Sequence, residues 1–118
     1  MSYNFKNKST NPHFPNISDV PPQEVLDNAK DLTLVDVRED SEYTGELGHA
    51  AGTTLINLSK IPQSLASLPK DKPIVFLCRS GGRSAQAASF AKQQGVDNVF
   101  NMLGGMLLWN QLQLPTEK

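Results

Sequence analysis

Cysteine is almost absent from this sequence, because Cys78 is the single one among 118 residues. A lone cysteine cannot form a disulfide within the chain, and it leaves no second thiol to resolve a disulfide formed at the first. The two histidines, His13 and His49, lie far from Cys78 and from each other, so their spacing gives no metal-ligand pattern. The composition argues against a disulfide-braced scaffold, and we expect neither a metal nor any other cofactor.

Neither a charge excess nor a long apolar run is present. The formal net charge is -1 and the sequence pI is about 6.1, so the chain lacks the basic surface of a nucleic-acid-binding or membrane-binding protein. No apolar run approaches the ~18 residues that span a bilayer, and residues 1–9 lack the apolar centre of a signal peptide. We therefore expect a cytoplasmic protein without a nucleic acid or membrane partner, and a lone cysteine fits that reducing compartment.

The order of the predicted elements indicates one α/β domain. Hydrophobic residues make up 38% and charged residues 19% of the chain, as in small globular domains. Residues 1–16 are polar and without periodicity, so we expect an N-terminal arm that is flexible or laid along the surface, followed by a domain over residues 17–115. Short apolar runs predict strands at 17–18, 32–37, 54–57, 74–77 and 98–102. Helical patterns predict helices at 22–29, 39–43, 84–94 and 106–112.

Strands that alternate with helices predict a three-layer fold with a mostly parallel central sheet, here of about five strands, and helices on both faces. Ligands bind such sheets at the carboxyl ends of the strands. Cys78 directly follows the predicted strand 74–77. The sequence therefore predicts that the only thiol lies at the ligand-binding edge of the sheet.

The turn after Cys78 is suited to an anion. Gly81 and Gly82 carry no side chains, so backbone N–H groups can converge on one point without a steric cost. The helix predicted to begin near Ser84 adds unpaired N–H groups and a partial positive charge. These groups are expected to stabilise a thiolate and any anionic group attached to it.

Two arginines strengthen this interpretation. Arg79 and Arg83 place two full positive charges next to a thiol whose ordinary pKa is about 8.5, and we expect them to lower that pKa. A buried structural cysteine would not require such a turn. We therefore interpret Cys78 as a nucleophile and residues 79–84, including Ser80 and Ser84, as the loop that binds its substrate.

Four residues separate Cys78 from Arg83, which gives the spacing C-x4-R. Cysteine-dependent phosphatases surround a phosphoryl group with a C-x5-R loop, so the shorter loop here is sized for a smaller group on the sulfur, such as one more sulfur atom. Three further segments form a signature with this loop: Leu34-Val35-Asp36-Val37-Arg38-Glu39, Gly48-His49-Ala50-Ala51-Gly52-Thr53, and Leu103-Gly104-Gly105-Met106 with Trp109. In this order, the four segments resemble a single-domain rhodanese-type (thiosulfate) sulfurtransferase over nearly the whole chain.

The resemblance implies transfer of a sulfane sulfur through a persulfide on Cys78. The donor would be thiosulfate or a persulfide, because the segments 42–49 and 78–84 resemble rhodanese domains associated with persulfide oxidation. The acceptor would be cyanide or a thiol, and a thiol-carrying protein is a further candidate. We assign Arg79 to the negative group of the donor, and Arg83 either to the same group or to bracing the loop.

Three other polar residues of the signature are assigned to structural support. Asp36 and Arg38 close a predicted buried strand, where polar side chains usually satisfy backbone groups. His49 invites interpretation as a general base, but an ionised thiolate needs no base to attack. We therefore expect all three to hold loops in place.

Three alternatives remain open at this point. A small cysteine phosphatase or arsenate reductase would need a wider loop around a tetrahedral oxyanion. A non-catalytic rhodanese-like docking or sulfur-carrier module would usually lack the cysteine or the loop, and this sequence keeps both. A thiol-based redox sensor is the third, because a reactive cysteine is also easily oxidised.

Overall fold

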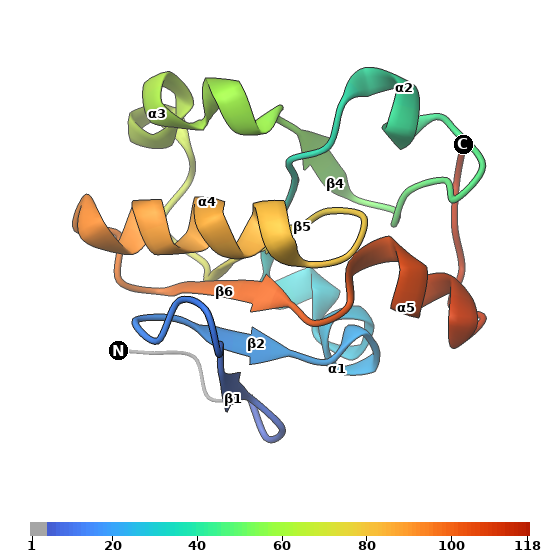
Figure 1. Ribbon diagram of the computed structural model, residues 1–118, viewed down its shortest axis with the longest axis horizontal. Helices are drawn as coiled ribbons and strands as arrows, with labels where there is room; N and C mark the ends of the chain where they lie inside the picture. The colour runs from blue at the N-terminus through green and yellow to red at the C-terminus, as the bar shows by residue number, and fades with distance from the viewer. Residues whose placement is uncertain (1–4) are drawn as a thin grey trace.

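The computed structural model describes residues 5–118, and these form one six-stranded sheet with helices on both sides (Figure 1). The strands are β1 (Ser9–Thr10), β2 (Ser18–Val20), β3 (Thr33–Asp36), β4 (Thr53–Leu55), β5 (Ile74–Leu77) and β6 (Val99–Met102). The α-helices are α1 (Pro22–Asp27), α2 (Asp40–Tyr43), α3 (Ile61–Ser64), α4 (Gly82–Gln93) and α5 (Gly105–Gln111). Three short 3-10 helices, η1 (Ala29–Asp31), η2 (Leu58–Lys60) and η3 (Leu65–Ser67), complete the connections.

The sheet has the strand order β1-β2-β6-β5-β3-β4, and every pairing is parallel except that of β1 with β2. The parallel α/β architecture predicted from the sequence is confirmed, and the sheet has six strands where about five were expected. The additional strand is Ser9–Thr10, which lies in the segment expected to be an arm. The two polar residues of β1 show no apolar–polar alternation in the sequence, so the strand is recognised only from its pairing with β2.

Each strand of the sheet centre alternates its side chains between two separate cores. Val35, Ile74 and Phe76 face α3 and α4 and belong to one buried cluster. Leu34 and Val75 point the other way, into a second cluster that contains Met106 and Trp109 from α5. Because both faces are covered, these strands are apolar throughout, which is the pattern of buried parallel strands.

The N-terminal segment packs against the domain wherever the structure describes it. Phe5 is only 3% exposed and its ring meets that of Phe100 edge-on at 4.9 Å. Asn16 accepts a hydrogen bond from Ser89 Oγ on α4 at 2.9 Å. The remainder of the expected arm, residues 1–4, lies outside the described residues. Among residues 5–118, no helix is both long and apolar enough to cross a membrane.

Candidate active site

Cys78 directly follows β5, which is the sheet strand between β6 and β3. The carboxyl ends of these three parallel strands meet at one edge, where parallel sheets bind their ligands. Three donors converge on Cys78 Sγ: the Gly81 N–H at 3.1 Å, the Ser84 N–H at 3.4 Å and the Ser84 hydroxyl at 3.2 Å. Cys78 itself is 1% exposed, so the sulfur is enclosed by its own loop.

The N-terminus of α4 is built around this sulfur. The helix begins at Gly82, two residues before the start predicted from the sequence, so Arg83 and Ser84 are in its first turn. Gly81 precedes the helix with φ of 102°, a left-handed conformation that glycine adopts without a steric penalty. No side chain caps the helix in the usual way. The sulfur instead accepts the free Ser84 N–H, and the helix dipole favours a negative charge there.

The N-terminus of α5 holds the same loop from the opposite side. Met106 N–H donates to Cys78 O at 2.8 Å and Leu107 N–H donates to Arg79 O at 2.9 Å. Gly105 has φ of 58°, and a Cβ there would lie 2.5 Å from each of these two carbonyl oxygens. The second glycine of the Gly104-Gly105 pair is therefore needed for the helix to approach the Cys78 loop this closely.

Gly105→Ala is expected to lower the free energy of unfolding by about 1–3 kcal/mol, because the backbone must shift to admit the methyl group. The loop should move with it, so alkylation of Cys78 by iodoacetamide should also change in rate. Gly52→Ala is the matched control, because Gly52 shares a positive φ of 81° but nothing lies within 4 Å of the added Cβ. Equal effects of the two substitutions on the alkylation rate would contradict the close approach of α5.

Arg83 braces the loop from the side of α2. Its guanidinium forms two hydrogen bonds with the Glu42 carboxylate, at 2.7 and 2.8 Å. These bonds lower the pKa of Glu42 to about 2 and raise the pKa of Arg83 above its usual value, while burial opposes both shifts. Of the two roles considered for Arg83, the geometry favours bracing, because its charge is already paired.

The Glu42–Arg83 pair should make stability depend on pH in a defined window. The pKa of Glu42 is lower in the folded protein than its usual 4.5, so the pair stabilises the fold above pH 4.5 and its contribution is lost as the pH falls toward 2. Glu42→Gln should thus lower the melting temperature at pH 7 and have less effect below pH 4. The difference should correspond to less than about 1 kcal/mol, because both side chains are partly exposed. A difference in melting temperature that stays constant from pH 7 to pH 3 would argue against this pair.

Asp36 and Arg38 form a buried ion pair, and they are 0% and 1% exposed. Arg38 Nε and Nη2 donate to the Asp36 carboxylate at distances between 2.8 and 3.1 Å. The same guanidinium also donates to Gly48 O at 2.8 Å and to Glu42 O at 3.1 Å. The pair therefore ties the segment 42–48 to the end of β3, and its hydrogen-bond partners do not include Cys78.

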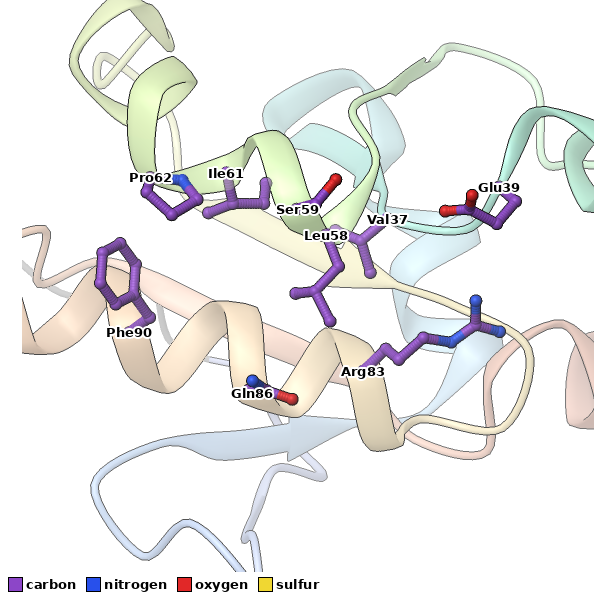
Figure 2. Close-up of a pocket in the computed structure, with 9 residues that line it drawn as sticks. All are labelled: Val37, Glu39, Leu58, Ser59, Ile61, Pro62, Arg83, Gln86 and Phe90. Atoms are coloured by element: carbon purple, nitrogen blue, oxygen red, sulfur yellow. The ribbon is translucent and has the colours of Figure 1, made fainter.

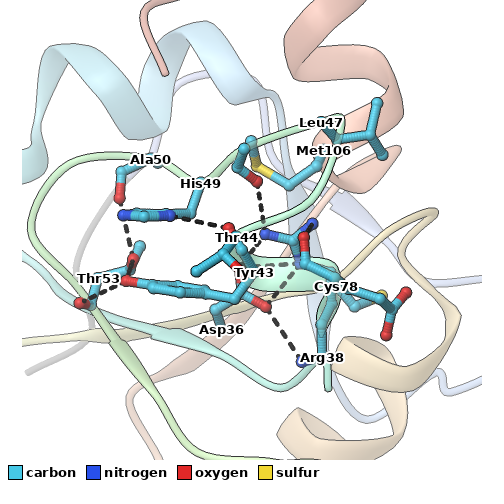
Figure 3. A network of polar contacts seen from close by, with 12 residues as sticks. Asp36, Arg38, Tyr43, Thr44, Leu47, His49, Ala50, Thr53, Cys78 and Met106 are labelled. Atoms are coloured by element: carbon cyan, nitrogen blue, oxygen red, sulfur yellow. Dashed lines mark hydrogen bonds and ion pairs between the residues drawn. The ribbon is translucent and has the colours of Figure 1, made fainter. Parts of the chain in front are cut away.

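His49 belongs to a polar network that lies beside this ion pair (Figure 3). His49 Nδ1 lies 2.9 Å from Tyr43 O, and the two rings stack with centroids 3.8 Å apart. The His49 backbone N–H donates to Glu117 O at 2.7 Å, which fastens the C-terminal residues to this loop. These contacts have the character of structural support, and none of them reaches Cys78.

Three clefts border the loop that carries Cys78. The first, of about 380 Å³, lies beside Gly81, Asp19 and Asn101. Two more touch the loop at Arg79 and at Arg83. One, of about 400 Å³, is bordered by Arg79, Glu46 and Leu107. The Arg79 side chain is exposed and makes no hydrogen bond or ion pair with the rest of the described chain, so its charge is free to meet an anion there. The other cleft, of about 480 Å³, is mostly apolar and lies between α4 and residues 58–62, with Arg83 at one end (Figure 2).

Sequence reasoning did not single out Glu42, Asn101 or Asp19 as parts of the site. Asn101 Oδ1 accepts a hydrogen bond from the Ser84 hydroxyl, and Asn101 Nδ2 donates one to Asp19 Oδ1 at 2.9 Å. Its signal in the sequence is a polar residue in the otherwise apolar run Val99–Met102, since buried polar groups need specific partners. Glu42 carries no comparable signal. Within residues 5–118, no group of three or more metal-ligating side chains could hold a metal ion.

The fold and the site together define a class of protein. It is an α/β domain in which a cysteine follows the carboxyl end of a central strand and is enclosed by a short loop and a helix N-terminus. The model of the rhodanese-like domain matches residues 21–112 of the chain. This protein belongs to the rhodanese-like family.

Relatives support sulfur transfer as the class of activity. A sulfurtransferase from Allochromatium vinosum is 36% identical over 90 residues, which are 76% of this chain and 82% of the relative. The thiosulfate sulfurtransferase GlpE from Pseudoalteromonas translucida is 31% identical over 96 residues, 81% of this chain and 89% of GlpE. The crystal structure of a rhodanese-related protein from Thermoplasma volcanium superposes with a TM-score of 0.75 at 30% identity, covering 82% of this chain and 94% of that one.

Proposed function

We propose that this protein carries a sulfane sulfur on Cys78 and moves it from thiosulfate or a persulfide to a thiol or cyanide. The observation that carries the proposal is the convergence of the Gly81 N–H and the Ser84 N–H on Cys78 Sγ, with the Ser84 hydroxyl, which also faces Asn101 Oδ1, at 3.2 Å. Donors directed at one sulfur stabilise negative charge on it. The catalytic role of Cys78 and the substrate-binding role of residues 79–84 belong to this proposal.

In the first step, the Cys78 thiolate attacks the outer sulfur of thiosulfate. A new sulfur–sulfur bond forms on Cys78, the sulfur–sulfur bond of thiosulfate breaks, and its electron pair leaves with sulfite. Arg79 meets the negative charge of the donor, since its side chain is exposed beside the 400 Å³ cleft. A low-molecular-weight persulfide would react in the same way and leave as a thiolate.

In the second step, an acceptor thiolate or cyanide attacks the outer sulfur of the persulfide. The bond from that sulfur to Cys78 breaks, and the thiolate of Cys78 is regenerated as the leaving group. Between the steps, the outer sulfur carries the negative charge and lies among the N–H groups of residues 79–84. A thiol-carrying protein is a further acceptor of the same chemistry.

The enclosed position of Cys78 limits how substrates reach it. Because Cys78 is 1% exposed, the loop over the sulfur must open to admit even a small donor. Arg79 and Ser80 are exposed residues of that loop, whereas Gly81 is held against the sulfur. A chain with one unpaired cysteine suits a reducing compartment, and the cytoplasm is the location that we propose.

The test of the function is the intact mass of the protein after incubation with thiosulfate. A gain of about 32 Da that disappears on adding cyanide or a thiol is expected, because one sulfur is loaded and then removed. Arg79→Met should load more slowly at low thiosulfate concentration and reach the same final mass. No gain with thiosulfate or with glutathione persulfide would favour a non-catalytic docking module. Hydrolysis of an aryl phosphate that depends on Cys78 would favour a phosphatase.

A further inference from the structure

A chain of buried polar side chains runs from Cys78 toward the N-terminal segment. Ser84 Oγ lies 3.2 Å from Cys78 Sγ and also donates to Asn101 Oδ1 on β6. Asn101 Nδ2 donates to Asp19 Oδ1 on β2 at 2.9 Å, and Asn11 Nδ2 donates to the same oxygen at 2.9 Å. Ser84, Asn101 and Asp19 are 0%, 2% and 4% exposed, so these contacts are largely shielded from solvent. Asp19 and Asn101 border a cleft of about 380 Å³ together with His13, the titratable side chain that faces this end of the chain of contacts.

The Ser84 hydroxyl has one proton and faces two groups that can accept it. When Cys78 is a thiol, its S–H donates to Ser84 Oγ and Ser84 donates to Asn101 Oδ1, so all three groups are satisfied. When Cys78 is a thiolate, Ser84 must turn its proton to the sulfur, and Asn101 Oδ1 loses that donor. Formation of the thiolate therefore breaks a buried hydrogen bond.

Asp19 determines which end of the Asn101 amide faces Ser84. A carboxylate only accepts hydrogen bonds, so Asn101 must turn Nδ2 toward Asp19 and Oδ1 toward Ser84. Asn11 is fixed in the same sense, because its Oδ1 accepts the backbone N–H groups of His13 and Phe14, each at 2.9 Å. Both amides thus direct their NH₂ groups at Asp19. As a result, the acceptor Oδ1 of Asn101 stays directed at Ser84.

We propose that Asp19 and Asn101 are positioning residues that hold the Ser84 proton away from Cys78 and thereby restrain formation of the free thiolate. This inference rests on the proposed role of Cys78 as the nucleophile. In a persulfide the negative charge lies on the outer sulfur, the inner sulfur needs no proton from Ser84, and the bond from Ser84 to Asn101 stays intact. The polar chain therefore favours the sulfur-loaded protein over the unloaded thiolate.

The other charged groups around the sulfur are independent of this chain. Arg83 on α4 interacts electrostatically with Cys78, and its charge is paired with Glu42. Arg79 follows Cys78 in the loop, and on β3 the Asp36 carboxylate is paired with Arg38. In the described part of the protein, none of these groups is hydrogen-bonded to Ser84 or Asn101. Substitutions at positions 19 and 101 therefore leave the other charges near the sulfur in place.

The test is the pH profile of Cys78 alkylation by iodoacetamide, which needs no sulfur donor and stays informative even if no persulfide forms. Asp19→Asn lets the Asn101 amide turn over, donate to Ser84 and release the Ser84 proton to the sulfur. The midpoint of the profile should then fall by about one pH unit. Asn101→Ala removes the competing acceptor and should shift the midpoint in the same direction. Ser84→Ala removes the donor and should shift it upward.

A double substitution separates the action through Ser84 from the plain loss of a charge. In the Ser84→Ala background, Asp19→Asn should keep less than about half of its effect on the midpoint. Asp71→Asn, at an exposed position, should leave the midpoint unchanged. The proposal is overturned if the variants that still unfold cooperatively show unchanged or higher midpoints for Asp19→Asn and Asn101→Ala. An equally large shift by Asp19→Asn with and without Ser84 would also overturn it.

Discussion

Cys78→Ser is expected to reduce sulfur transfer from thiosulfate by at least about 10³-fold while the fold is retained. A serine hydroxyl is a far weaker nucleophile than a thiolate, and it cannot carry the transferred sulfur as a persulfide. The stability should change by less than about 1 kcal/mol, because serine has the same shape as cysteine with a smaller terminal atom, and its oxygen can still accept hydrogen bonds from Gly81 and Ser84. The measurement is sulfite released from thiosulfate in the presence of cyanide or a thiol.

Chemical modification of the wild-type protein is the matched control for this substitution. Because Cys78 is the only cysteine in the chain, iodoacetamide modifies a single thiol, and complete alkylation should abolish sulfite release to the same extent. Thermal unfolding of Cys78→Ser checks that the loss is chemical. Sulfite release that persists in a folded Cys78→Ser protein would refute the persulfide mechanism.

The local parts of the site were predictable, and the long-range parts were not. The apolar run before Cys78 and the glycines after it are contiguous, so the sequence alone predicted a strand, a turn and a helix, and the structure places them in that order. The bond from Arg83 to Glu42 joins residues 41 positions apart, and the bond from Asn101 to Asp19 joins residues 82 positions apart. No local pattern specifies such partners, because they depend on which strands become neighbours in the sheet.

The N-terminal segment shows how the same limit applies to the fold. Its polar composition predicts an arm that is either flexible or laid along the surface, and it does not predict that Asn11 is 6% exposed and hydrogen-bonded to Asp19. The start of α4 was misjudged for a related reason: Gly82 is a poor helix former, but the first turn is held by contacts with Cys78 and the sheet. In both places tertiary contacts outweigh the intrinsic preference of the residues.

Asp36→Asn is expected to lower the free energy of unfolding by about 3–5 kcal/mol, because it leaves the Arg38 guanidinium buried without a counter-charge. The free energy of unfolding of a small domain is only about 5–15 kcal/mol, so the variant should lose a large part of its stability. The measurement is urea-induced unfolding, with a lower midpoint at an unchanged slope. Asp71→Asn, at an exposed position, is the control and should change the stability by less than about 0.5 kcal/mol.

The double substitution Asp36→Leu with Arg38→Met distinguishes the ion pair from the tethers that Arg38 provides. Removing both charges should recover much of the stability, since a buried pair and an apolar pair of similar volume often contribute about equally. Sulfur transfer by the double variant should stay below that of the wild-type protein, because the carbonyl groups of Gly48 and Glu42 lose their donor and segment 42–48 is released. That segment contains the carboxylate that braces Arg83 beside Cys78. Full sulfur transfer in the double variant would show that Arg38 acts on stability alone.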